Sequence, residues 1–206
     1  LIWKILPQFH EQKIIDAHAI KLEKTIKYQD TILADSQSTK NDLIKYYSKV
    51  DKKRIHVVYP GIGKEFRLIN DKEKIKNILK KYKIDVDSKF LLYVGAIEPR
   101  KNLDLAIQVF SELIKDSQFS DYKFIIAGRA GWKNKDVFQS IKRLKLDDKV
   151  KLIGFVAHED LPYLYNAASL TVYLSSYEGF GLPPLESLAC GTPVIAGNNS
   201  SMKETV

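Results

Sequence analysis

The sequence predicts an α/β protein built around a parallel β-sheet. Three observations lead to this class. Short apolar runs recur along the chain, and the run Phe90 to Gly95 has the continuous apolar character of a strand in the buried centre of a parallel sheet. Stretches with helical spacing separate the runs, and glycine-containing turns follow several of them. Strands that alternate with helices imply βαβ crossovers and therefore a Rossmann-like sheet.

Residues 1–62 are expected to be the last part of a second Rossmann-like domain. Apolar residues at helical spacing predict a helix over 11–28, and a short strand over 31–34 follows it. Ser36 or Ser38 suits the N-cap of the next helix, and the strand expected over 54–59 ends at Pro60-Gly61. The charged stretch 63–89, weakly helical around 74–82, is predicted to be a linker.

Residues 90–206 are expected to form a nearly complete Rossmann-like domain, truncated at its C-terminal end. In such sheets ligands bind beyond the carboxyl ends of the strands, which is where the glycine-rich turns of this segment fall. The expected strands are 90–95, 123–127, 150–153, 170–174 and 193–196, and the expected helices are 103–115, 135–144, 160–168 and 184–189.

Composition narrows the possible functions. The 206 residues are 45% hydrophobic, which is enough for one full core and part of a second. A single cysteine, Cys190, excludes a disulfide framework and agrees with a reducing, cytoplasmic location. The four histidines lie far apart without HExxH spacing, so no metal is expected. The apolar start, residues 1–6, is too short for a membrane span.

Positive charge is concentrated in the first part of the chain. Residues 1–89 contain 20 of the 33 Lys and Arg residues but only 12 of the 25 acidic ones, so the whole net charge of +8 lies there. This excess suits an anionic surface, which leaves peripheral contact with the inner face of a membrane as one interpretation. Solvated helix faces are the simpler explanation. A nucleic-acid partner is not expected, because aromatic residues and arginines do not alternate as in RNA-binding sheets.

The most distinctive turn is Tyr177 to Glu186. Gly179 and Gly181 allow a tight turn in which backbone N–H groups can approach a ligand, and the two prolines that follow start a helix whose N-terminus suits a phosphate. Glu186, expected in the first helical turn, can accept hydrogen bonds from a ribose diol, and Glu178 can contact sugar hydroxyls. Ordinary turn and capping chemistry explains the same residues taken alone.

A second group follows the first strand of this domain. Pro99 separates the loop from the next helix, and Asn102 is expected to cap that helix. Arg100 and Lys101 then lie at the ligand edge, where they can neutralise a diphosphate. Solvated surface charges would explain this pair equally well if it stood alone.

Together these segments resemble a known family. The ordered combination VGAIEPRKNLDLAI, FIIAG, LIGFVAHEDLPYLYNAASL and YEGFGLPPLESLACGTPVIAG is similar to the C-terminal domain of family 4 (group 1) glycosyltransferases, which have the GT-B fold. SQSTKNDLIKYY and RIHVVYPGI resemble the end of that family's N-terminal, acceptor-side domain. The resemblance implies a retaining transfer of a hexose from a nucleotide-diphosphate sugar to an acceptor hydroxyl, on a saccharide or a lipid-linked saccharide, with no metal required.

The resemblance also assigns roles to individual residues. Glu178 and Glu186 match the family's Glu-x7-Glu pair, with Glu186 on the ribose and Glu178 near the transferred sugar. Lys101 with Arg100 would stabilise the leaving group. Many relatives have Arg directly after the strand glycine, Gly95, where this chain has Ala96, so Arg100 takes that role or the stabilisation is weaker. The remaining donor-binding positions are Gly95, Gly179, the amides of Phe180, Gly181 and Leu182, and the base-flanking pair Phe155 and Val156.

Several alternatives remain. A nicotinamide-dependent oxidoreductase is disfavoured, because Gly179 and Gly181 are followed by Leu-Pro-Pro rather than by the rest of a GxGxxG motif. A GT-B phosphorylase would need a lysine that holds pyridoxal phosphate. A third alternative is a nucleotide-binding fragment without turnover. The PRKN sequence resembles transferases that make surface polysaccharides and favours GDP-mannose over other GDP- or UDP-linked sugars.

Overall fold

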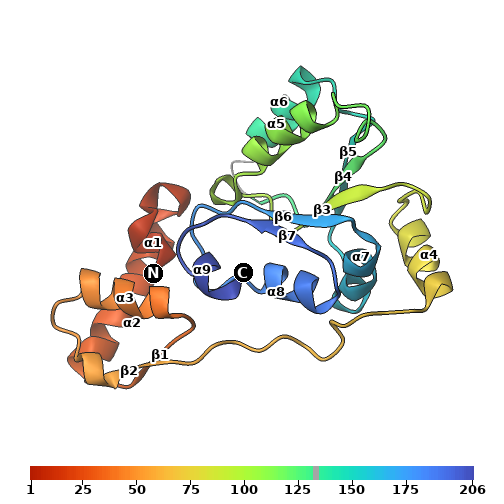
Figure 1. Ribbon diagram of the computed structural model, residues 1–206. Coiled ribbons are helices and arrows are strands. Elements are labelled where there is room, and N and C mark those ends of the chain that lie inside the picture. Colours follow the sequence, from red (N-terminus) through yellow and green to blue (C-terminus); the bar gives the residue numbers. More distant parts are fainter. Residues whose placement is uncertain (132–134) are drawn as a thin grey trace. The chain divides into compact units, whose positions relative to one another are not determined.

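The computed structural model describes residues 1–131 and 135–206, which form two compact units. Unit 1 comprises residues 1–61, 176–181 and 198–206, and unit 2 comprises residues 62–175 and 182–197. The chain therefore passes between the units four times. Figure 1 labels the helices and strands of both units.

Unit 2 is organised around a five-stranded parallel sheet with the order β5-β4-β3-β6-β7. All five expected strands are present, and their observed ends differ from the expected ones by two residues at most. The expected α/β class with a Rossmann-like parallel sheet is confirmed. The strands are β3 (Phe90–Val94), β4 (Lys123–Ala127), β5 (Val150–Gly154), β6 (Leu170–Tyr173) and β7 (Val194–Ala196).

Helices cover both faces of this sheet, as Figure 1 shows. One face carries α5 and α6, and Phe110 of α5 lies against Phe124 of β4 with ring centroids 5.6 Å apart. On the other face, α4, α7 and α8 contribute to a core that includes Leu92 and Val94 of β3. All five β3 residues are buried, as their apolar run predicts. The helices are α4 (Lys72–Lys81), α5 (Leu103–Leu113), α6 (Lys135–Arg143), α7 (Leu161–Ala167) and α8 (Leu182–Ala189).

The expected linker 63–89 is instead part of unit 2. Phe66, Leu79 and Ile84 are each at most 5% exposed and belong to the same core cluster as Leu92. Asp71 caps α4 by accepting a hydrogen bond from the N–H of Lys74 at 2.9 Å. The lysines that made the stretch look like a solvated connection lie on the outer side of an amphipathic helix, so its charge hid its apolar stripe.

Unit 1 contains a small parallel pair, β1 (Ile32–Ala34) and β2 (Ile55–Val57), joined through α3 (Gln37–Tyr46). This is one βαβ step, as expected for the end of a Rossmann-like domain. Ser36 is the N-cap of α3 and accepts a hydrogen bond from the N–H of Thr39 at 2.9 Å, which confirms one of the two expected caps. The other helices of unit 1 are α1 (Ile2–Ile5), α2 (Gln12–Lys27) and α9 (Met202–Thr205).

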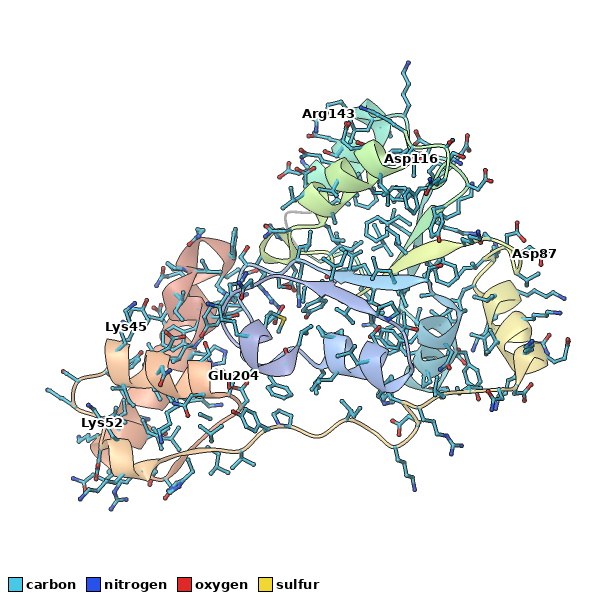
Figure 2. All side chains as sticks on the ribbon, in the orientation of Figure 1. Lys45, Lys52, Asp87, Asp116, Arg143 and Glu204 are labelled. Carbon is cyan, nitrogen blue, oxygen red and sulfur yellow. The ribbon has the colours of Figure 1, made fainter. Side chains whose placement is uncertain are left out.

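Two later segments of the chain, 176–181 and 198–206, also belong to unit 1. Glu204 of α9, labelled in Figure 2, accepts hydrogen bonds from the backbone N–H groups of Gln37 and Ser38, each at 2.7 Å. Its carboxylate lies at the positive N-terminal end of α3, where negative charge is stabilising. The expectation of one domain over residues 90–206 is therefore corrected: the sheet is in unit 2, whereas these two segments pack with residues 1–61.

Lys45 and Lys52, at the outer edge of unit 1 in Figure 2, are exposed to solvent, as solvated helix faces require. Among the described residues, no helix combines the length and apolar character needed to cross a membrane.

Candidate functional site

The sheet of unit 2 has a switch point between β3 and β6. From β3 the chain builds the sheet outward through β4 to β5, whereas β6 and β7 extend it on the other side of β3. Ligands of open α/β sheets bind in the crevice at the carboxyl ends of the two strands beside such a reversal. The segments that follow β3 and β6 therefore define the candidate site.

Lys101 is held between these two strands. It ends a short 3-10 helix, Pro99–Lys101, that follows β3, and it is only 6% exposed. Its Nζ donates a hydrogen bond to the hydroxyl of Tyr173 at 2.8 Å and lies 4.9 Å from the centroid of the same ring. Tyr173 is the last residue of β6. A buried cation is thus fixed at the switch point, where its field is less screened than at a surface.

The neighbours of Lys101 hold the loop in place. Asn102 adopts a left-handed conformation with φ 52°, and its side-chain amide donates to the carbonyl of Leu174 at 2.9 Å. Asn102 occupies the N-cap position of α5, but its side chain makes no capping hydrogen bond. Instead, it connects the loop to the residue that follows β6. Arg100 forms a partly buried ion pair with Glu98, with Nε and Oε2 3.0 Å apart. The guanidinium of Arg100 is therefore held beside Glu98, in the same short segment as Lys101.

Glycines allow the loops after β3, β4 and β5 to run close together. The N–H of Gly95 donates to Ala127 at 2.9 Å, and the N–H of Gly128 donates to Gly154 at 2.7 Å. A Cβ on Gly128 would lie 1.8 Å from the carbonyl oxygen of Gly95. Gly95 itself has φ 148°, a region that side chains rarely adopt. These residues form a floor of closely packed backbone at the ligand edge.

Glu186 supplies a buried carboxylate on α8. The residue is 9% exposed, and its Oε2 accepts a hydrogen bond from the hydroxyl of Tyr165 at 2.9 Å. Burial raises the pKa of Glu186, while the Tyr165 hydrogen bond and the nearby His158 act in the opposite direction. A carboxylate kept at this cost suits a ligand that donates hydrogen bonds.

The start of α8 differs from the prediction. The helix begins at Leu182, two residues earlier than expected, so Glu186 lies just beyond the first turn rather than inside it. Pro183 and Pro184 have no N–H, so Leu182 and Leu185 are the N–H donors that remain among the first four helical positions. Fewer amides than a standard helix N-terminus offers are therefore available to an anion here.

Phe155 and Val156, the pair expected to flank the base, lie in two different environments. Val156 is 6% exposed and belongs to the core cluster, whereas Phe155, directly after β5, is 60% exposed. The guanidinium of Arg129 lies 4.5 Å from the centroid of the Phe155 ring. A solvent-facing aromatic ring with a cation on it provides a surface on which a planar base can stack.

The glycine turn lies in unit 1, where its backbone is tightly held. Ser201 donates to the carbonyls of Glu178 and Phe180, at 3.0 and 2.8 Å, and the N–H of Glu178 donates to Ser200 at 3.0 Å. Gly181 needs its glycine, because φ is 98°, a backbone conformation that side chains rarely adopt. A Cβ on Gly179 would lie 2.6 Å from Oδ2 of Asp35.

The predicted site residues thus fall into two sets. Unit 2 holds Gly95, Arg100, Lys101, Phe155, Val156, Leu182 and Glu186, and unit 1 holds Glu178, Gly179, Phe180 and Gly181. Tyr165 and Tyr173, which contact Glu186 and Lys101, were not predicted individually. Their only signal was that both stand in or beside the quoted motifs. Within the described part of the chain, no group of three or more His, Cys, Asp or Glu residues is arranged to hold a metal ion.

Comparison with known proteins assigns the family. Residues 74–206 match the family described as glycosyl transferases group 1. The chain belongs to this family. The group 1 assignment covers the sheet, the Lys101 loop, the glycine turn and Glu186, so it spans both sets of predicted site residues.

Individual relatives agree with the group 1 assignment. The chain is 30% identical over 200 residues to the O-antigen chain mannosyltransferase B of Escherichia coli, covering 97% of this chain and 51% of that protein. It is 33% identical over 183 residues to the serotype-specific mannosyltransferase WbdA of E. coli, covering 86% and 22%. A crystal structure of Anabaena Alr3699/HepE in complex with UDP and glucose shares the fold, with a TM-score of 0.78, 22% identity, and coverage of 97% and 52%. The chain spans about half the length of the first curated relative.

Proposed function

We propose that the chain is the donor-binding part of a retaining glycosyltransferase, which transfers a hexose from a nucleotide-diphosphate sugar to a hydroxyl of a saccharide or lipid-linked saccharide. The observation that carries the proposal is the pairing, in a group 1 unit, of a buried cation at the switch point with a buried carboxylate on α8. Lys101 and Glu186 provide opposite charges for the two ends of a nucleoside diphosphate.

Each residue has a task that its surroundings support. Glu186 accepts hydrogen bonds from the ribose hydroxyls through a buried carboxylate whose orientation is set by Tyr165. Phe155 stacks on the base. Lys101, with Arg100, faces the diphosphate, on which negative charge grows as the bond to the sugar breaks. A cation fixed in advance stabilises that charge without reorganisation, which is the largest single contribution in many enzymes. Glu178 is assigned to the transferred sugar through the family's Glu-x7-Glu pair.

Mannose is the proposed sugar. The support is that an O-antigen chain mannosyltransferase and a serotype-specific mannosyltransferase are among the relatives, and that the PRKN loop favours the same class. The reaction is proposed to need no metal, because Lys101 and Arg100 supply positive charge at the leaving group. We also propose a saccharide acceptor in polysaccharide biosynthesis, with the O-antigen chain relative as support.

The test is isothermal calorimetry with UDP and GDP on the wild type and on Glu186→Ala, with magnesium and with EDTA. We expect one nucleotide to bind in both buffers, and Glu186→Ala to lose at least about tenfold in affinity, since a hydrogen bond to a charged group contributes about 1.5–3 kcal/mol. A folded wild type that binds neither nucleotide would refute the donor site. Binding only with magnesium would refute the metal-free reaction.

Turnover is tested separately with GDP-mannose and a mannose-terminated oligosaccharide, with NMR of the product's anomeric configuration. Transfer with retention of configuration is expected. Inversion would refute the retaining mechanism, and nucleotide binding without transfer to any acceptor would favour the binding-only alternative.

A further inference from the structure

The side chain of Tyr165 is fully buried, and its hydroxyl donates a hydrogen bond to Glu186. Tyr165 is 0% exposed, its ring packs edge-on against Phe66 at 6.0 Å, and it lies in the core cluster with Leu92 and Val94. Packing of the ring needs no hydroxyl, and phenylalanine would fill the same space. The hydroxyl therefore has a task beyond packing, because a buried polar group is costly unless it is bonded.

The direction of the hydrogen bond is fixed. Burial and the neighbouring Glu186 raise the pKa of Tyr165 well above its ordinary value, so the side chain remains a phenol and donates. Its proton goes to Oε2 of Glu186 over 2.9 Å. One carboxylate oxygen is thereby oriented by the protein, and the carboxylate plane is set.

The helix that carries Tyr165 is itself held in place. Thr192, just before β7, donates to the carbonyl of Tyr165 at 2.5 Å, and Ser187 of α8 donates to Thr171 of β6 at 2.7 Å. These bonds tie α7 and α8 to the sheet through buried polar groups. The Tyr165 hydroxyl and the Glu186 carboxylate consequently meet in one arrangement rather than in several.

We propose that Tyr165 is a positioning residue for nucleotide recognition: by holding Oε2 of Glu186, it presents the carboxylate to the ribose hydroxyls and favours ribonucleotides over deoxyribonucleotides. This inference rests on the proposed function, in which Glu186 binds the ribose.

Two consequences follow, and neither is expected of a residue that only packs. The first is selectivity, because a misoriented carboxylate distinguishes ribose from deoxyribose less well. The second is a pH effect. The groups that act on Glu186 are Tyr165 from α7, His158 from the segment before α7, and Glu65 from the segment before α4, while Cys190 at the end of α8 lies nearby. Of these, the Tyr165 hydroxyl favours the ionised carboxylate, so its removal raises the pKa of Glu186 further.

The test compares Tyr165→Phe with a matched control, Tyr163→Phe, in the intact protein. Tyr163 lies on the same helix, and the centroid of its ring is 5.1 Å from Nζ of Lys74. Tyr163→Phe therefore also removes one tyrosine hydroxyl from α7, but not the one that contacts Glu186. Affinities for UDP, GDP and their 2′-deoxy forms are measured by calorimetry between pH 5.5 and 8.5. Circular dichroism confirms that each variant is folded.

For Tyr165→Phe we expect about tenfold weaker binding of the ribonucleotide and a smaller preference for ribose over deoxyribose. When the pH is lowered, its affinity should begin to fall at a higher pH than that of the wild type. Tyr163→Phe should match the wild type. A folded Tyr165→Phe with wild-type affinity, ribose preference and pH profile would overturn the inference, and so would equal losses for both sugars without a pH shift.

Failure of the proposed function looks different. If the wild type binds neither nucleotide, or if Glu186→Gln binds ribonucleotide and deoxyribonucleotide as the wild type does, then Glu186 does not bind the ribose and the inference falls with that assignment. If Glu186→Gln removes the ribose preference and Tyr165→Phe does not change it, then the proposed function stands and only the role of Tyr165 is refuted.

Discussion

Gly128→Ala is predicted to be the most destabilising glycine substitution at the floor of the site. The added Cβ would lie 1.8 Å from the carbonyl oxygen of Gly95 and 2.6 Å from its carbon, and both are backbone atoms. A Cβ does not tolerate contacts under 3.0 Å, so the loop after β3 must retreat by more than about 1 Å. Gly128 is not among the residues with positive φ, so the cost arises from crowding alone.

The magnitude follows from what that retreat breaks. The Gly95-to-Ala127 hydrogen bond, at 2.9 Å, is lost when the loop after β3 moves, and the Gly128-to-Gly154 bond, at 2.7 Å, is lost as well when residue 128 shares the movement. Losing each costs about 1 kcal/mol, and overpacking adds about 1–3 kcal/mol. We therefore expect the free energy of unfolding to fall by about 3–5 kcal/mol.

Two other glycines separate the possible causes. Gly154 has φ 73° but open space around its Cβ position. Gly154→Ala should therefore lower the free energy of unfolding only through the left-handed backbone conformation, by about 1 kcal/mol. Gly61 has open space and no positive φ, so Gly61→Ala should be neutral or stabilising by up to about 1 kcal/mol. The assay is urea unfolding followed by far-ultraviolet circular dichroism. A Gly128→Ala variant no less stable than Gly154→Ala would refute the reasoning.

Three further predictions concern charged groups. Lys101→Met should lower kcat of sugar transfer by about 10²–10³-fold, because a fixed charge at the leaving group is lost, and an unchanged kcat in steady-state assays would exclude that role. Glu186→Gln should raise the free energy of unfolding at pH 7 in urea titrations. Burial raises the pKa of Glu186, so its ionised form destabilises the fold above that pKa, and the gain should vanish below about pH 4, where the carboxyl is protonated in both states. Asp160→Asn should destabilise at pH 7 in the same urea titrations, and by progressively less as the pH falls in acid. Burial opposes ionisation of Asp160, but hydrogen bonds from Lys81 and Tyr82 outweigh it and lower its pKa, so the stabilisation is present above about pH 4 and is lost as the pH falls through the lowered value.

The sheet was predictable from the sequence because its signal is local. The β3 run is apolar at every position and all five of its residues are buried, so hydrophobicity alone marks a central strand. The glycines after the strands mark the ligand edge for the same local reason. The cap at Ser36 was also predictable from the sequence, because the N–H that it accepts from is only three residues away.

The remainder depends on distant partners. Asn102 has the composition of a helix cap, but Leu174, 72 residues later, takes its side chain. The stretch 63–89 reads as polar because α4 shows its lysines to solvent, while Leu79 and Ile84 reach a core made by other segments. The turn 176–181 comes shortly after β6, and nothing within its sequence indicates that Ser200 and Ser201 hold its backbone in the other unit.

The Glu186–Tyr165 pair shows why such a contact is better evidence of function than a motif alone. Two glutamates separated by seven residues are common, and the sequence alone reveals neither their burial nor their partners. In the structure, the carboxylate is 9% exposed and its pKa is raised by burial, so retaining it lowers stability. A glutamine or a methionine would fit the same helix at smaller cost. A residue that costs stability and is held in orientation by a dedicated buried hydroxyl is most economically explained by a ligand that needs its charge, and strain or cost of this kind concentrates at functional sites.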